Sequence, residues 1–480
     1  MNKDNKKTKI IATLGPASSN RETILQLIQA GVDVFRINFS HADYDIVKSN
    51  VDIIRSLNEE FGFTTSILGD LQGPKLRVGI VKEGSYLNPG DILTFTNENV
   101  EGDATKVFMT YERFSKDVKV GERILVDDGK LVFEVMETNE KDTVKAKTIQ
   151  GGLLSSKKGV NLPNTAISLP ALTEKDIQDA HFMLDNEFDW IALSFVRHAQ
   201  DIKDLKELIK NHTTSKFKTP IVAKIEKPEG VENIEEILEE CDAIMVARGD
   251  LGVEVPMEEV PVIQKKLVEK ARYHAKPVII ATQMMETMIN SLTPTRAEVN
   301  DVANSVLDGA DAVMLSGETS VGKYPVDVVK NITKIIKNIE KDKIYINSNK
   351  PIEKSTIIEE RYVTDMLCYS AVRIAKKANA QAIITLTNSG YTAFQISAHR
   401  PNAHIIVFCS NRRVLTKLNL LWGVRAYFYN MQKSTDETVI QVNMLTHNYG
   451  FVQQGDFVVN LNAMPVYESG KTNTLRLSTI

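Results

Sequence analysis

Four short apolar runs between residues 221 and 319 each end in polar or charged residues: IVAKIEKP (221–228), AIMVARGD (243–250), VIIATQM (278–284) and AVMLSGET (312–319). Runs rich in Ile, Val, Leu and Ala that are bounded by Gly, Pro or Asp are typical of strands buried on both faces, as parallel sheets require. We therefore expect four parallel strands here, each of which leads into a polar loop.

The pattern occurs four more times toward the amino terminus, in IIATLGP (10–16), VFRINFS (34–40), SILGDLQG (66–73) and WIALSFVR (190–197). Apart from one long step, the runs start 22 to 35 residues apart, about the length of one strand–helix unit. The stretches between them have helical periodicity; Ile24, Leu27 and Ile28, for example, share one face. Eight strands alternating with helices predict an α/β fold, a (β/α)₈ TIM barrel, and leave a doubly wound open sheet as the alternative.

The long step, from residue 66 to residue 190, holds runs that alternate as in antiparallel strands. Within it, Asp-Asp-Gly at 127–129 lies between two such runs and predicts a hairpin. We expect residues 74–169 to form an inserted all-β lid domain over the face where barrel active sites lie. The barrel then comprises residues 1–73 and 170–345.

After the barrel, a polar segment rich in Asn and Lys (345–356) is typical of a linker. From about residue 357, helices again alternate with strands, and five strand-like runs reach the end of the chain. Residues 346–480 are therefore predicted to form a C-terminal α/β domain with a small open sheet.

Composition excludes several classes of protein. Of 480 residues, 58 are Lys or Arg and 62 are Asp or Glu, so the net charge of −4 argues against a general nucleic-acid binder. Three distant cysteines (Cys241, Cys368, Cys409) fit neither a disulfide framework nor a zinc site. With no signal-peptide pattern and no apolar stretch of about 20 residues, we expect a soluble, cytoplasmic protein that does not bind membranes.

Reactive groups in TIM barrels lie at the carboxyl ends of the strands. In this sequence those ends carry Arg36, Asn38, Ser40, Asp70, Ser194, Arg197, Lys224, Glu226, Arg248, Asp250, Thr282, Ser316 and Glu318. A surface ion pair explains any one of them taken singly. It explains the whole set poorly, because several lie within otherwise apolar strands.

Glu226 and Asp250 lie at adjacent strand ends, and two carboxylates with space for water suit Mg²⁺. Lys224 precedes Glu226 by two residues, so both lie on one face of their strand. A lysine beside a divalent metal suits stabilisation of a transferring phosphoryl group, whereas a structural Lys–Glu pair is the alternative. At Gly249–Asp250 a loop turns into a helix, where free N–H groups would hold a small carboxylate.

Eight motifs, in order along nearly the whole chain, resemble those of pyruvate kinases: RINFSH (36–41), GPKLR (73–77), KKGVNLP (157–163), AKIEKPEGVENI (223–234), MVARGDLGVE (245–254), ATQMMETM (281–288), PTRAEVNDVANSVLDGADAVMLSGETSVGKYP (294–325) and SGKTNTLRL (469–477). The resemblance implies a barrel, a β-barrel lid inserted after the third strand, an α/β C-terminal domain and a homotetramer. It also implies glycolytic phosphoryl transfer from phosphoenolpyruvate to ADP, which gives pyruvate and ATP.

By motif position, the resemblance implies that Arg36 binds the phosphoryl group and that Lys224 stabilises the transition state. It implies that Glu226 and Asp250 ligate Mg²⁺ or Mn²⁺, and that the N–H groups of Gly249 and Asp250, with the catalytic Thr282, hold the substrate carboxylate. It places Arg77, Lys158 and Asn38 at the nucleotide.

Many members of the resembled family bind K⁺ at positions that match Asn38, Ser40, Asp70 and the carbonyl of residue 71. Their third-strand motif typically has Glu where this chain has Lys75. A tethered ammonium has the same charge as K⁺, so we expect Lys75 to replace the ion and turnover not to require K⁺. Pairing of Lys75 with a nearby acid at the lid hinge is the alternative.

In the C-terminal segment, Thr387, Ser389, Gly390 and Thr392 form a strand–turn–helix that predicts a phosphate cradle, with an ordinary capped turn as the alternative. The resemblance implies a sugar-phosphate effector there, although Tyr391 stands where a basic residue is frequent. Two other functions compete with the kinase: an enolate-forming, metal-dependent lyase or aldolase on a related barrel, and a regulatory phosphate-binding protein without catalysis.

Overall fold

The eight predicted strands close into a parallel barrel. The computed structural model describes residues 6–163, 165–212, 217–342, 361–430, 434–464 and 472–480, which leaves the predicted linker outside the described residues. Around the barrel the strands follow the order β1 (Lys9–Thr13), β16 (Ala312–Leu315), β15 (Val278–Ala281), β14 (Ala243–Ala247), β13 (Ile221–Ile225), β12 (Trp190–Leu193), β3 (Ser66–Asp70) and β2 (Val34–Asn38). The TIM-barrel prediction is confirmed, and the open-sheet alternative is wrong.

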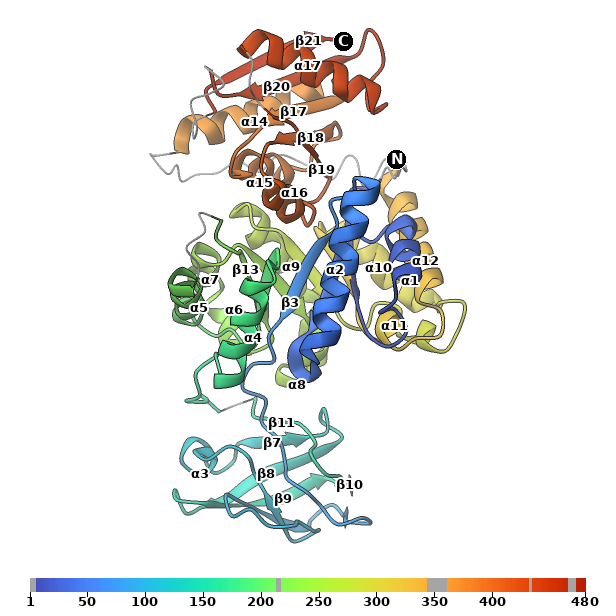
Figure 1. Ribbon diagram of the computed structural model, residues 1–480. Coiled ribbons are helices and arrows are strands. Elements are labelled where there is room, and N and C mark those ends of the chain that lie inside the picture. Colours follow the sequence, from blue (N-terminus) through green and yellow to red (C-terminus); the bar gives the residue numbers. More distant parts are fainter. Residues whose placement is uncertain (1–5, 164, 213–216, 343–360, 431–433, 465–471) are drawn as a thin grey trace.

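Helices follow the strands and surround the barrel (Figure 1): α1 (Arg21–Ala30), α2 (Tyr44–Phe61), α4 (Glu174–Asp185), α5 (Ala199–His212), α6 (Pro228–Glu232), α7 (Ile234–Glu240), α9 (Val260–Tyr273), α10 (Arg296–Asp308) and α12 (Pro325–Glu340). Apolar side chains such as Ile11, Leu68 and Met245 fill the barrel interior. The shorter helices α8 (Arg248–Glu254) and α11 (Gly317–Ser320) directly follow β14 and β16. They therefore lie at the carboxyl end of the barrel.

The segment after β3 folds into mainly antiparallel sheets at one end of the molecule (Figure 1). Its six-stranded sheet has the order β11 (Val160–Asn161), β7 (Arg123–Val126), β8 (Leu131–Thr138), β9 (Thr143–Gln150), β5 (Ile92–Thr96) and β6 (Lys106–Phe108), while β4 (Tyr86–Leu87) pairs with β10 (Gly152–Leu153) and α3 (Phe114–Asp117) caps one side. The predicted Asp-Asp-Gly hairpin joins β7 to β8. Isolated bridges from Arg77 to Gly159 and from Val78 to Met109 connect the two edges of the sheet.

The C-terminal segment forms a five-stranded sheet at the opposite end from the lid (Figure 1), in the order β19 (Val424–Phe428), β18 (His404–Cys409), β17 (Ala382–Leu386), β20 (Phe457–Asn462) and β21 (Thr474–Thr479). Only β21 pairs antiparallel. Its helices are α14 (Tyr362–Lys377), α15 (Tyr391–Ala398), α16 (Arg412–Leu418) and α17 (Thr435–Asn448). This is the small open sheet that the alternating pattern predicts.

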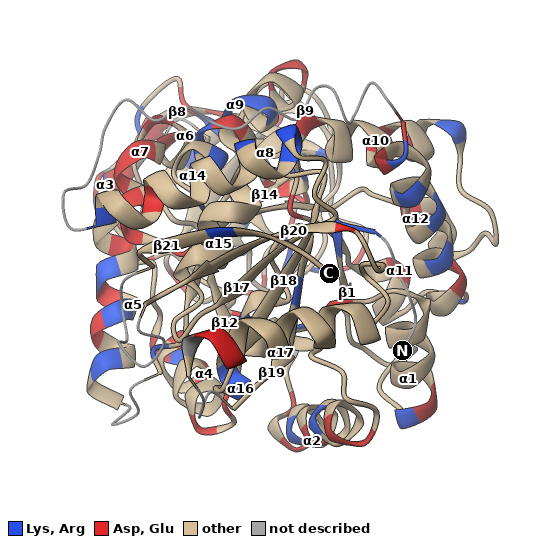
Figure 2. Ribbon diagram, turned by 90° about the horizontal axis from the view of Figure 1, so that it is seen from above, with Lys and Arg blue, Asp and Glu red and all other residues tan. Residues whose placement is uncertain are grey.

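Most of the long outer helices carry charges of both signs. Figure 2 shows basic and acidic residues interspersed on α5 and α12, whereas the charged residues of α7 are all acidic. Among the described residues, none of the helices is long and apolar enough to cross a bilayer.

Candidate active site

Charged side chains from three barrel strands meet at the carboxyl rim. Arg36 Nε donates to Asp70 Oδ2 at 2.7 Å. Lys224 Nζ lies 3.1 Å from Asp70 Oδ1 and 3.0 Å from Glu226 Oε1. None of these four side chains exposes more than 12% of its surface. We call Arg36, Asp70, Lys224 and Glu226 the rim cluster; its two cations balance its two carboxylates.

Burial opposes every charge in the rim cluster, and the neighbouring charges decide the outcome. Burial lowers the pKa of Lys224, but Asp70 and Glu226 outweigh it and hold that pKa above its usual value. Burial raises the pKa of Asp70, but Lys224 and Arg36 reverse the shift and leave it below its usual value. Burial and the charge of Asp250 raise the pKa of Glu226 despite the attraction of Lys224. Lys224 is therefore a firmly held cation.

The loop after β12 braces the rim cluster. Lys224 Nζ donates to Ser194 Oγ at 2.6 Å, and Ser194 Oγ donates to the Leu71 carbonyl at 2.7 Å. The N–H of Phe195 donates to Glu226 Oε2 at 2.7 Å, from a backbone with φ of 54°. The residue types do not indicate this N–H as a site group, because backbone groups leave no signal in residue type; only its place after a strand end indicates it.

A second group lies where β14 and β15 end. Gly249 N–H donates to Thr282 Oγ1 at 2.7 Å, and that hydroxyl donates to the Ala281 carbonyl at 2.6 Å. Thr282 and Gln283 have φ of 68° and 54°, which costs roughly 1–3 kcal/mol for each residue. A Cβ on Gly249 would lie 3.3 Å from Thr282 Oγ1, so a glycine suits this close approach. Gly249, Asp250 and Thr282 are thus brought together, as the sequence predicts.

The donor set suits a divalent metal that also binds substrate. Among the described residues, no group of three or more His, Cys, Asp or Glu side chains is arranged to hold a metal. Mg²⁺ needs only one or two protein carboxylates, because it keeps waters and takes substrate oxygens. The charge of Asp250 raises the pKa of Glu226, so the two carboxylates lie close enough to repel each other, and a shared cation would relieve that repulsion.

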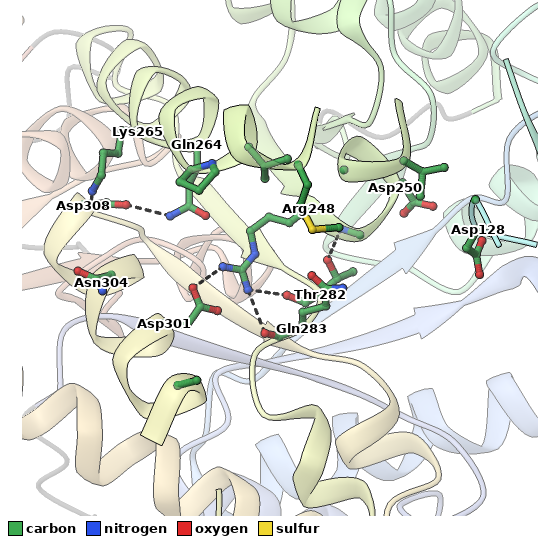
Figure 3. Close-up of a pocket in the computed structure, with 18 of the residues that line it drawn as sticks. Asp128, Arg248, Asp250, Gln264, Lys265, Thr282, Gln283, Asp301, Asn304 and Asp308 are labelled. Carbon is green, nitrogen blue, oxygen red and sulfur yellow. Dashed lines mark hydrogen bonds and ion pairs between the residues drawn. The ribbon is translucent and has the colours of Figure 1, made fainter. Parts of the chain in front are cut away.

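A cleft of about 1150 Å³ lies between the barrel rim and the lid hairpin (Figure 3). Gly249, Asp250 and Thr282 line its barrel side, and Asp128 lines its lid side. Lys75 also lines it; this side chain is exposed, and within the described part of the chain it makes no ion pair.

The predicted nucleotide residues lie outside that cleft. Arg77 Nη1 donates to the Lys157 carbonyl at 3.0 Å, and Lys158 Nζ lies 3.0 Å from Asp127 Oδ1, so both cations belong to the lid. Asn38 ends β2, where its Oδ1 accepts from the N–H of Ser40 at 3.1 Å.

Three groups of the predicted monovalent-cation site have protein partners: Asn38 Oδ1, the carbonyl of residue 71 and the Asp70 carboxylate. Asn38 Oδ1 binds the N–H of Ser40, and the carbonyl of residue 71 accepts from Ser194. Asp70 lies between Arg36 and Lys224. Protein groups thus already neutralise the carboxylate of this site.

Among the described residues, Asn161 and Arg197 form side-chain hydrogen bonds between the lid and the barrel. Asn161 Nδ2 in β11 donates to Glu254 Oε1 at 2.8 Å, and the same oxygen accepts from Lys227 at 2.9 Å. Arg197 donates to the carbonyls of Ile167 and Leu169 at 2.5 and 2.7 Å. The sequence analysis did not single out Asn161 or Glu254.

The turn predicted to be a phosphate cradle has hydrogen bonds among its own residues. Thr387 Oγ1 accepts from Gly390 N–H at 2.9 Å, and the hydroxyls of Thr385 and Thr392 lie 3.3 Å apart. Ser389 Oγ lies 3.5 Å from the N–H of Tyr391. The Tyr391 hydroxyl donates to Asp365 at 2.7 Å, and the Arg361 guanidinium lies 4.0 Å from the centre of the tyrosine ring.

Known proteins that are similar to this chain identify its family. Residues 5–329 match the family model "Pyruvate kinase, barrel domain", and residues 365–478 match "Pyruvate kinase, alpha/beta domain". The chain is 41% identical to the pyruvate kinase of Mycobacterium intracellulare over 473 residues, which is 98% of each chain. It is 41% identical to that of Corynebacterium glutamicum over 474 residues, 98% of this chain and 97% of the relative.

A solved pyruvate kinase from Cryptosporidium parvum superposes with a TM-score of 0.92 at 33% identity, covering 100% of this chain and 97% of the other. The shared fold therefore extends over the barrel, the lid and the C-terminal sheet. This chain belongs to the pyruvate kinase family and is a phosphotransferase.

Proposed function

We propose that this chain transfers the phosphoryl group of phosphoenolpyruvate to ADP, which gives pyruvate and ATP. The rim cluster is the observation that carries the proposal, because it fixes two cations at the buried end of the barrel strands. A phosphoryl group in transit spreads negative charge over its oxygens, and preorganised cations in a low-dielectric site stabilise that charge.

Each residue then has a separate task. Arg36, which also donates to Thr13 at 3.1 Å, binds the phosphoryl group, and Lys224 stabilises the transition state. The N–H groups of Gly249 and Asp250 hold the substrate carboxylate. For the Thr282 hydroxyl to donate to the substrate, it would turn away from the Ala281 carbonyl that it bonds in the unliganded protein, and we count Thr282 among the catalytic residues on that basis.

Glu226 and Asp250 would hold Mg²⁺ or Mn²⁺, as the family generally requires Mg²⁺. When bound, such an ion neutralises charge on substrate oxygens. Arg77 and Lys158 from the lid, with Asn38 from the rim, would bind the phosphates of ADP. Since both lid cations lie outside the cleft described above, we expect the lid to move toward the rim when the nucleotide binds.

The direct test is a coupled assay for ATP formed from phosphoenolpyruvate and ADP. We expect ATP to form and Mg²⁺ to be required. Cleavage of an enolate-forming substrate without ATP formation would instead favour a lyase or aldolase. Binding of phosphoenolpyruvate without any turnover would favour a regulatory protein.

We propose further that turnover does not require K⁺. Two observations support this proposal: the exposed Lys75 ammonium on the cleft wall forms no ion pair with a described residue, and the Asp70 carboxylate is already neutralised. The test compares kcat in tetramethylammonium or Na⁺ buffer with kcat in K⁺ buffer at matched ionic strength. We expect equal rates for the unmodified protein and K⁺-dependent rates for Lys75→Glu; strong K⁺ activation of the unmodified protein would contradict the proposal.

We also propose a sugar-phosphate effector site at Thr387, Ser389, Gly390 and Thr392, where the Thr387 hydroxyl already accepts from the N–H of Gly390. Titration of kcat and KM with sugar phosphates tests it. An unchanged KM for phosphoenolpyruvate at millimolar effector would contradict the proposal and would mean that the turn is only structural.

We also propose a homotetramer with domain limits of 1–73 and 170–345 for the barrel, 74–169 for the lid and 346–480 for the C-terminal domain. Exposed apolar side chains on and beside α9 and α10 support a contact between copies: Met257, Val262, Leu292, Val299 and Leu307. Light scattering after size exclusion measures the assembly. The cytoplasmic location stays a prediction.

A further inference from the structure

Arg248 links three elements around the proposed carboxylate-binding loop. It is the first residue of α8, and its side chain is 9% exposed. Nη1 lies 2.7 Å from Asp301 on α10, while Nη2 donates to the carbonyls of Thr282 and Gln283 at 2.6 and 3.2 Å (Figure 3). One guanidinium thus bridges a carboxylate and two consecutive carbonyls.

Those two carbonyls belong to residues with strained backbones. Thr282 and Gln283 both have positive φ, which β-branched and long side chains rarely adopt. Such a conformation persists only where the surroundings hold it in place. Arg248 donates to the carbonyl of Thr282. Gly249, which follows Arg248 in the chain, donates its N–H to the hydroxyl oxygen of Thr282. Two hydrogen bonds therefore join the residues that follow β14 to Thr282, which follows β15.

We propose that Arg248 is a positioning residue that fixes the Thr282 hydroxyl, and through it the Gly249 N–H that bonds to it, in the geometry needed for catalysis. The inference rests on the proposed function, in which these two groups contact the substrate. Arg248 acts through the loop and not on the substrate, because both of its terminal nitrogens already have partners on the protein. A planar fork suits this role, because Asp301 and the two carbonyls bind different terminal nitrogens of Arg248, whereas lysine has a single nitrogen.

The test is a double-mutant cycle between Arg248→Met and Thr282→Ala. Because misplacing a catalytic group by about 1 Å costs roughly 10²-fold in rate, we expect Arg248→Met to lower kcat by about 10- to 100-fold. If Arg248 acts through Thr282, the same change should cost less than about 3-fold when Thr282 is already alanine. Equal losses in both backgrounds would overturn the inference.

Lys265→Met is the matched control. Lys265 lies on α9 and pairs with Asp308, which is on α10 as Asp301 is, but Lys265 does not contact the Thr282 loop. We expect this variant to keep normal kcat. If Arg248→Met does not fold, Arg248→Lys replaces it in the cycle, with an intermediate loss expected.

Hydrogen exchange gives a readout that does not need activity. In the unliganded protein, the Gly249 amide should exchange faster in Arg248→Met than in the unmodified chain, because its acceptor is no longer held. Unchanged exchange would overturn the positioning role. Failure of the unmodified protein to form ATP would instead contradict the proposed function and leave the exchange result to decide the role of Arg248.

Discussion

Lys224 occupies a position that only a cation can fill. Replacing it with methionine leaves Asp70 and Glu226 buried without their shared partner, and it removes the charge that would stabilise phosphoryl transfer. Loss of one well-placed donor costs roughly 3–4 kcal/mol, so we predict that Lys224→Met lowers kcat by about 10²–10³-fold or more. The KM for phosphoenolpyruvate should change little if the effect is confined to the transition state. Steady-state kinetics measure kcat and KM, and the apparent melting temperature shows whether the variant is folded.

Lys175→Met is a suitable control for that experiment, because it removes a lysine–aspartate pair, with Asp179, that lies outside the rim cluster. This variant should keep its activity. Near-normal kcat in folded Lys224→Met would refute the assignment of Lys224.

Between elements, the hydrogen bond from β11 to the end of α8 ties the lid to the barrel. Its acceptor, Glu254, is almost fully buried, and its second oxygen has no hydrogen-bond partner among the described residues. A hydrogen bond to a charged group is worth about 1.5–3 kcal/mol. We therefore predict that Asn161→Ala lowers kcat/KM for ADP by about 10-fold, because the lid is held less firmly over the cleft.

Thr165→Val tests whether any lost lid hydrogen bond has this effect, because the Thr165 hydroxyl bonds to Glu122 within the lid. Titration of initial rates with ADP compares the two variants. Equal losses of kcat/KM in both would mean that the contact with the barrel has no special role.

Across the whole molecule, buried charges join the C-terminal domain to the opposite end of the barrel. Arg400, 1% exposed, lies 2.7 Å from Asp311. Lys9 of β1 donates to the Val424 carbonyl at 2.9 Å and lies 3.5 Å from Asp33. These contacts cross from the barrel to the C-terminal sheet, so domain packing depends on groups that titrate.

Burial lowers the pKa of Lys9 to about 7 despite the attraction of Asp33, while Arg425 and Lys6 add repulsion. From pH 7 up to its ordinary value near 10.5, the unfolded chain holds more protons on Lys9 than the native protein does. The free energy of unfolding therefore rises with pH over this window. We predict that the melting temperature of the unmodified protein, relative to Lys9→Met, increases from pH 7 to about pH 9.5.

Differential scanning fluorimetry at several pH values measures this difference. Lys7, whose pKa burial lowers to about 8, is present in both proteins and does not enter the comparison. A difference that is constant with pH would contradict the prediction.

Much of the fold follows from local sequence. Strands such as Ala243–Ala247 are fully buried runs of small and branched apolar residues, so their composition predicts them. The hairpin at 127–129 follows from residues that tolerate positive φ, which Asp127, Asp128 and Gly129 all adopt. The position of Lys224, Glu226 and Asp250 at one rim follows as well, because parallel barrel strands all end on the same side.

The pairings inside the site depend on how distant segments pack. Asn161 and Glu254 are 93 residues apart, and Asp70 and Lys224 are joined only because β3 and β13 flank β12 in the closed barrel. The Phe195 N–H and the Arg248 fork use backbone groups whose direction is set by loop conformation. Local preferences act over a few residues and so predict strands, turns and the rim, whereas barrel register and loop strain decide which polar atoms meet.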